Sequence, residues 1–70
     1  MNRVALYGKG SRQKYYRLLT IGLDSRTIAR QGRELQESGT ITSWFTRRFE
    51  TGETMPDRYE RIPLKAGARG

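Results

Sequence analysis

The sequence contains neither cysteine nor histidine. Without cysteine, the chain can form no disulfide and no thiolate zinc or iron–sulfur site. Without histidine, it lacks the commonest metal ligand and the commonest general base of enzymes. The seven carboxylates show no paired spacing that would define a catalytic cleft. These absences predict a protein that binds a partner, with no metal or organic cofactor, rather than an enzyme.

Long hydrophobic runs are missing as well. The longest apolar stretch, Leu18 to Leu23, is interrupted by Thr20 and Gly22 and falls far short of the roughly 20 residues that a membrane-spanning helix needs. The first residues lack the hydrophobic region of a signal peptide. Together with the absence of cysteine, this predicts a cytoplasmic protein that does not enter a membrane.

The chain has only 70 residues, which is enough for one domain. We expect a single domain over residues 1–64 and a flexible basic tail over residues 65–70. A domain of this size buries roughly 60% of the surface that its unfolded chain exposes. Its stability is therefore expected to be small, and a dimer is left open.

Positive charge is what the sequence has in excess. Fourteen Lys and Arg residues stand against seven Asp and Glu residues, which gives a net charge of +7. No acidic residue precedes Asp24, whereas five cations do: Arg3, Lys9, Arg12, Lys14 and Arg17. Most of the cations are arginines, whose planar guanidinium groups suit bidentate contacts to phosphate. The expected partner is a nucleic acid or an acidic protein surface.

Local patterns predict two strands before the first acidic residue. Residues 3–7 favour a β-strand and are followed by Gly8-Lys9-Gly10-Ser11, in which two glycines offer positive-φ positions for a hairpin connection. A second strand is expected within residues 13–23. A short helix over residues 11–19 is the rival interpretation.

A helix is predicted over Asp24–Ser38. Asp24 or Ser25 can serve as the N-cap, and Gly39 stands where a terminating glycine is expected. Residues 40–51 match either a strand or a helix, and their four threonines and three aromatic residues favour a strand. A turn at Gly52 and a short edge strand within residues 58–64 complete the chain.

The predicted fold class is therefore α+β, a small two-layer β-β-α-β sheet with one helix on one face and a short C-terminal edge strand. Strand alternation divides the side chains between two faces. The face under the helix is expected to hold Val4, Leu6, Leu19, Ile21, Leu23, Ile41, Phe45 and Phe49. The opposite face, left open, is expected to hold Arg3, Ala5, Tyr7, Tyr16, Leu18, Thr20, Thr42, Trp44, Thr46 and Arg48.

Aromatic residues interleaved with arginines on an open sheet face can stack nucleic-acid bases while the cations contact phosphates. The candidate nucleic-acid-binding residues are Arg3, Tyr7, Lys9, Arg12, Lys14, Tyr16, Trp44 and Arg48. The alternative for Trp44 and Tyr16 is a purely structural role in the core. Because an open aromatic face suits unstacked bases, single-stranded DNA or RNA is slightly favoured over duplex DNA.

Two short segments resemble parts of DNA-binding families. The stretch LTIGLDSRTIARQGRELQ resembles the strand-to-helix passage of integrase arm-binding domains, and TITSW with FETGETMP resembles the end of a Cro-like helix-turn-helix. The first covers less than a third of the chain, and in the second Gln31 and Leu35 stand where the small residue and the turn glycine upstream of Ile41 are required. Neither resemblance assigns the chain to a family.

These features predict a small basic nucleic-acid-binding protein of the kind that phages, plasmids and other mobile elements encode. The alternative function is that of a small inhibitor or regulator that binds an acidic surface of a host protein.

Overall fold

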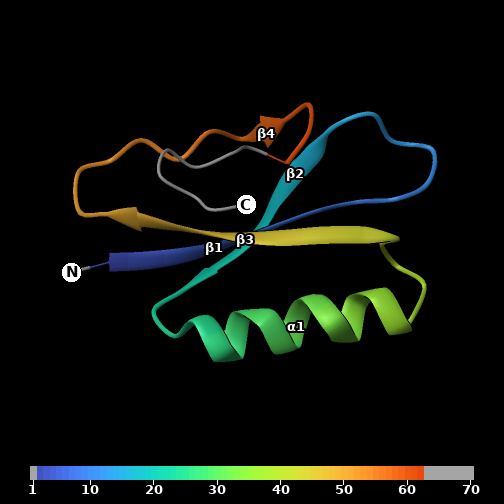
Figure 1. Ribbon diagram of the computed structural model, residues 1–70, viewed down its shortest axis with the longest axis horizontal. Helices are drawn as coiled ribbons and strands as arrows, with labels where there is room; N and C mark the ends of the chain where they lie inside the picture. The colour runs from blue at the N-terminus through green and yellow to red at the C-terminus, as the bar shows by residue number, and fades with distance from the viewer. Residues whose placement is uncertain (1, 63–70) are drawn as a thin grey trace.

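The structure is a computed structural model that describes residues 2–62 (Figure 1). It confirms the α+β class: one helix lies against a curled, antiparallel four-stranded sheet of order β3-β1-β2-β4. The elements are β1 (Asn2–Lys9), β2 (Tyr16–Gly22), α1 (Ser25–Glu37), β3 (Ser43–Glu50) and β4 (Arg58–Tyr59). The end of the predicted fourth strand and the tail over residues 65–70 lie outside the described residues. Within residues 2–62, no helix is long and apolar enough to cross a membrane.

Strand β1 is central to the sheet. It pairs with β3 along its whole length, from Asn2 opposite Glu50 to Lys9 opposite Ser43, and with β2 on its other side. Residues 4–8 of β1 are all buried. A strand with two neighbours and apolar side chains on both faces is stable only when both faces are covered.

Helix α1 begins and ends as its local sequence predicts. Asp24 is the N-cap: its carboxylate accepts hydrogen bonds from the backbone N–H of Arg26, at 3.2 Å, and from the hydroxyl of Thr27, at 2.9 Å. The Thr27 hydroxyl, followed by the Arg26 N–H, lowers the pKa of Asp24. At the other end, Gly39 has a φ of 86°, and the N–H of Thr40 donates to the carbonyl of Leu35 at 3.0 Å, the arrangement of a Schellman motif.

The inner face of α1 packs on one face of the sheet. The buried residues Val4, Leu6 and Ile28 form this half of the core, and Leu35 and Trp44 pack against it. Gly32 permits the close approach, because a Cβ at this position would lie 2.6 Å from two atoms of the Trp44 indole ring.

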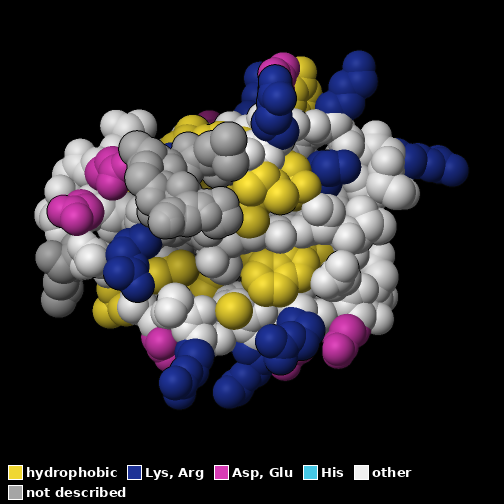
Figure 2. All heavy atoms as spheres, in the orientation of Figure 1, with side chains coloured by type: hydrophobic (Ala, Val, Ile, Leu, Met, Phe, Trp, Pro, Cys, Tyr) yellow, Lys and Arg dark blue, Asp and Glu magenta, His cyan; other side chains and the backbone are white. Residues whose placement is uncertain are grey.

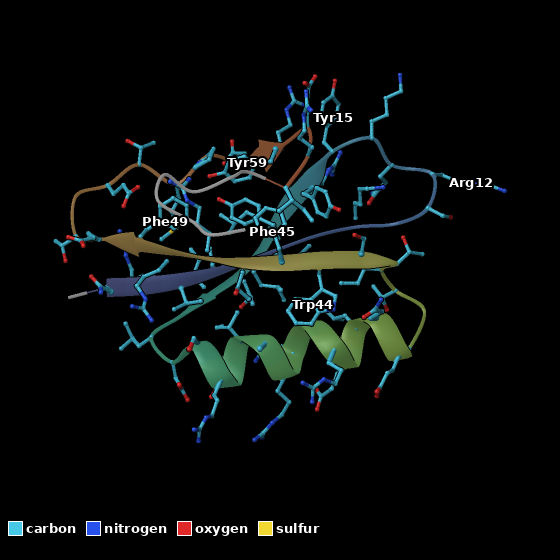
Figure 3. All side chains as sticks on the ribbon, viewed as in Figure 1. Arg12, Tyr15, Trp44, Phe45, Phe49 and Tyr59 are labelled. Carbon is cyan, nitrogen blue, oxygen red and sulfur yellow. The ribbon has the colours of Figure 1, made fainter. Side chains whose placement is uncertain are left out.

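The opposite sheet face is also covered, although it was expected to be open. The chain returns over it after β3, and Met55 and Tyr59 pack there against buried Ala5, Tyr7, Tyr16 and Phe49. Figure 3 shows Phe45, Phe49 and Tyr59 on this side of the sheet and Trp44 on the helix side. The aromatic side chains contact one another closely, with the Tyr7 and Phe45 rings stacked at 5.2 Å. The Tyr7 hydroxyl donates to the Pro56 carbonyl at 2.7 Å.

The predicted division of β3 between the two faces is therefore wrong. Tyr7 lies opposite Phe45, and Leu6 lies opposite Thr46, so Phe45 and Phe49 lie away from the helix, whereas Trp44, Thr46 and Arg48 lie on the helix side. The prediction counted alternation from Ile41, but β3 begins only at Ser43. The two residues before it belong to an irregular connection, and this breaks the alternation.

A bulge changes the division of β2 in the same way. Leu6 pairs with Thr20 and Tyr7 pairs with Leu18, which leaves Leu19 as an extra residue. Thr20 therefore lies on the helix side and Ile21 on the other, the reverse of the prediction. The predicted positions of Val4, Leu6, Ala5 and Tyr7, which precede any irregularity, are correct.

The β1–β2 hairpin is present, but its glycines act differently from the prediction. Within residues 2–62, only Gly39 and Gly52 have positive φ values. Gly8 instead lies within β1, where a Cβ would come within 2.9 Å of both the Ile41 and the Leu19 side chains. Gly8 therefore lies at a closely packed position of the strand and does not form the turn. The turn predicted at Gly52 is confirmed, with Glu53 N–H bonded to the Glu50 carbonyl at 2.9 Å.

Replacing Gly32 by alanine is expected to destabilise the protein. Alanine is favoured over glycine in a helix by about 1 kcal/mol, but the new methyl group would overlap the Trp44 ring, and overpacking typically costs about 1–3 kcal/mol. Urea unfolding measures the net effect. Gly10→Ala is the control, because its Cβ would meet only the Gln13 side chain at 3.7 Å. A Gly32→Ala protein more stable than the wild type would contradict the close contact.

Burial, followed by the neighbouring Tyr59, raises the pKa of Tyr7 from 10.0 to about 12. Because the folded-state value is raised, the contribution of neutral Tyr7 to stability is complete below pH 10 and is lost as the pH rises through about 12. When the absorbance of tyrosinate is followed against pH, one component should appear only near pH 12. The Tyr7→Phe substitution should remove this component. If the Tyr7→Phe substitution leaves the high-pH part of the titration curve unchanged, the Tyr7 ring is accessible to solvent.

Candidate nucleic-acid interface

Cations gather where the β1–β2 connection meets β4. We call this surface the basic end, and it consists of Lys9, Arg12, Lys14, Tyr15, Arg17 and Arg58. Figure 3 shows Arg12 projecting from the connecting loop and Tyr15 beside the start of β2. Lys and Arg side chains extend from the periphery of the molecule around a centre where hydrophobic side chains are visible (Figure 2).

The loop of the basic end is organised by Gln13. Its backbone N–H donates to the Gly10 carbonyl at 3.1 Å, and its side-chain oxygen accepts from the Gly10 N–H at 2.7 Å. The Lys9 ammonium lies 3.5 Å from the Gln13 carbonyl and 5.7 Å from the centre of the Tyr16 ring. Arg12 and Lys14 flank Gln13 and are both exposed, so their side chains are free to contact a ligand.

Strand β4 adds a cation from the far end of the chain. Arg58 pairs directly with Arg17 across β2 and β4, and its guanidinium lies 5.0 Å from the centre of the Tyr15 ring. Like charges directly opposite each other in a sheet are destabilising. Asp57 lines the same shallow hollow as Arg17 and Arg58. It forms no ion pair with either arginine, because the one ion pair within residues 2–62 joins Arg47 to Glu53. A bound anion would relieve the repulsion between the two arginines.

The structure brings together three of the eight predicted site residues, Lys9, Arg12 and Lys14. Arg3 lies opposite Phe49 and Arg48 lies opposite Val4, so both are at the far end of β1. The structure therefore does not place these two cations beside the hairpin loop.

The three predicted stacking residues are not available at an open surface. Tyr7 has no exposed area and Tyr16 only 6%, because the segment after β3 covers them. The Tyr16 hydroxyl shares a 2.7 Å hydrogen bond with the Ser43 hydroxyl. The Trp44 indole N–H donates to the Gln36 side chain of α1 at 2.9 Å. Tyr16 is therefore buried in the core, and Trp44 is half-buried between the sheet and α1.

Sequence reasoning missed three members of the basic end: Tyr15, Arg17 and Arg58. The sequence places Arg17 in the acid-free N-terminal third but gives no sign of the surface on which it lies. Arg58 lay in the predicted edge strand, and only its pairing with β2 brings it to the basic end. No local signal in the sequence specifies that pairing.

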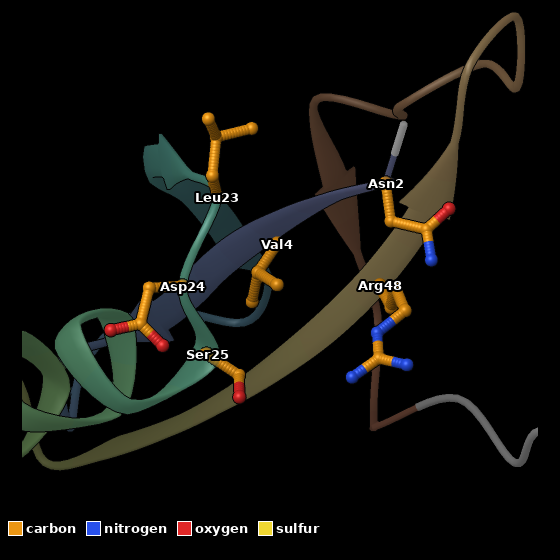
Figure 4. A pocket seen from close by; sticks show the side chains of 6 residues that line it. All are labelled: Asn2, Val4, Leu23, Asp24, Ser25 and Arg48. Carbon is orange, nitrogen blue, oxygen red and sulfur yellow. The ribbon is translucent and has the colours of Figure 1, made fainter.

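Two other charged surfaces have mixed signs. The exposed residues of α1 include three arginines but also Glu34 and Glu37. A hollow between the start of α1 and β3 is lined on one side by Asp24 and on the other by Arg48 (Figure 4). Neither surface concentrates positive charge as the basic end does. Within residues 2–62, no group of three carboxylates is placed to hold a metal ion.

Comparison of the chain with protein-family models, curated proteins and solved structures gives no significant match.

Because Trp44 packs between the sheet and α1, its fluorescence should report the core and not the ligand. We expect emission at a shorter wavelength than that of free tryptophan and little change when an oligonucleotide is added. Spectra recorded during an oligonucleotide titration test this. A large quenching on binding would indicate that Trp44 contacts bases after all.

Proposed function

We propose that the protein binds nucleic acid through the phosphate backbone, with the basic end as its contact surface. The observation that supports this most is the convergence of five cations from β1, the hairpin loop, β2 and β4. Two of them, Arg17 and Arg58, are directly opposed. Multiple phosphate contacts by such a surface give strong, salt-dependent binding.

Contacts to phosphate are favoured over base stacking as the source of affinity. The aromatic residues that suggested a stacking platform are used in the core, and only Tyr15 combines partial exposure with a place at the basic end. The earlier preference for single strands depended on that platform. Duplex DNA carries about one charge per 1.7 Å of helix axis, a higher charge density than that of a single strand. We therefore expect duplex DNA to bind at least as strongly as single strands.

Reversing charges at the basic end should weaken binding more than the same change elsewhere. We expect Arg12→Glu combined with Lys14→Glu to lower affinity at least about tenfold and to reduce the slope of log K against log salt by about 2, one for each lost phosphate contact. Fluorescence anisotropy with a labelled duplex, repeated over a range of salt concentrations, measures both quantities.

The matched control is Arg30→Glu combined with Arg33→Glu, which changes the net charge equally on the outer side of α1. We expect a smaller loss of affinity and a smaller change in slope. Equal losses from both pairs would place the interface elsewhere. If neither duplex nor single strands bind while one acidic protein is retained after nuclease treatment, the proposal fails in favour of a protein-binding regulator.

A further inference from the structure

Most of the outer edge of β2 has no neighbouring strand. Strand β4 pairs only with Tyr16 and Arg17, and the next main-chain bond to this segment joins the Leu18 N–H to the Asp57 carbonyl at 3.0 Å. Beyond that point, no strand within residues 2–62 lies beside residues 19–22 of β2. The outward N–H and C=O groups of such an edge are a template for pairing with another strand.

The two edges of the sheet differ in chemistry. The outer strand on the other side, β3, carries Arg47, Arg48 and Glu50, and charged residues of this kind prevent edge-to-edge association. The free part of β2 has no charged residue between Arg17 and Asp24. An edge without charge or proline is the one of the two that favours association.

Exposed apolar side chains concentrate on the same segment. Within the described residues, four large hydrophobic side chains are exposed, and three of them belong to five consecutive residues: Leu19 at 41%, Ile21 at 46% and Leu23 at 70%. The bulge directs Leu19 to the helix side, where it lines a hollow with Leu35. Ile21 shares the other side with Ala5. A strand added here would cover apolar groups on both faces of the sheet.

We propose that this edge of β2 pairs antiparallel with the same edge of a second copy of the chain, forming a two-fold symmetric dimer with a continuous sheet. The charges that bound the apolar segment select this occupant. Arg17 precedes it and Asp24 follows it, so a two-fold axis at Ile21 brings Asp24 of each copy toward the end of the free edge of the other, where Arg17 lies next to Arg58. Such a self-complementary contact is what two-fold symmetry requires.

Placing a charge on the edge should prevent dimer formation. Ile21→Lys is expected to convert the dimer to a monomer, whereas Thr46→Lys, on the opposite edge strand, should leave it intact. Sedimentation without nucleic acid, in about 0.5 M NaCl to screen the repulsion between two basic copies, measures the mass. Circular dichroism confirms that both variants are folded. A wild-type protein that stays monomeric at millimolar concentration, or a dimer that Ile21→Lys leaves intact, would overturn the proposal.

A cysteine variant tests the position of the two-fold axis. Because the chain has no cysteine, Ile21→Cys introduces a single thiol, and opposed residues of an antiparallel pair have Cβ atoms about 4.5–5.5 Å apart. Oxidation should link the Ile21→Cys protein into a covalent dimer, whereas the Thr46→Cys protein should remain monomeric on a non-reducing gel. Equal linking of both variants, or none at position 21, would contradict the pairing.

The contact between Arg17 and Asp24 can be tested separately from the strand pairing. Arg17→Glu places a carboxylate beside Asp24 of the second copy and should raise the dimer dissociation constant several-fold. Arg12→Glu makes the same change of charge away from the edge and should leave the constant unchanged. Equal effects of the two substitutions would show that Arg17 and Asp24 do not select a second copy.

Discussion

Strand β1 is apolar on both faces, and the rest of the structure depends on covering it. Residues 4–8 are buried in the middle of the sheet, with Val4 and Leu6 under the helix and Ala5 and Tyr7 on the other side. One helix can cover only one of these faces. The chain therefore returns after β3 across the second face, and the Tyr7 hydroxyl bonds to the carbonyl of Pro56 in that segment. A small domain thus uses most of its aromatic residues for its core.

The parts of the fold that could be predicted have local causes. Asp24 and Gly39 bound the helix through their own side-chain and backbone conformations, and the order of the elements follows from propensity and turn residues. Face assignment fails after Leu19 in β2 and along β3, because it extends alternation through two irregular places, the bulge at Leu19 and the connection before Ser43. A single extra residue exchanges the faces of everything that follows, and neither irregularity has a signature in the sequence.

The candidate site was predictable only in part for a related reason. The density of cations before Asp24 points to the hairpin loop, and Lys9, Arg12 and Lys14 do lie together there because chain neighbours stay neighbours in space. The contribution of Arg58 depends on the pairing of a two-residue strand with β2, which is a tertiary event. The predicted open face with Tyr16 and Trp44 fails for the opposite reason. Large aromatic rings bury more apolar area than other side chains, so a small domain with few aliphatic residues places them inside.

Net charge alone does not identify which cations are available for binding. The guanidinium of Arg47 lies 4.6 Å from the centre of the Phe49 ring and 3.4 Å from a carboxylate oxygen of Glu53, and it also contacts the Tyr59 hydroxyl. It therefore holds the segment after β3 against the sheet and is a structural cation.

Arg17 stands in contrast, since it faces Arg58 across the sheet. Like charges opposed in this way repel each other, and a polyanion bound as proposed would relieve that repulsion. A ligand that binds only the folded state stabilises it by mass action, so under the proposed function this pair of arginines would link the affinity of the basic end to the stability of the fold. Pairing of the β2 edges would add to this linkage, because it would join two basic ends on one continuous sheet and allow each to raise the effective concentration of the other on a long polyanion.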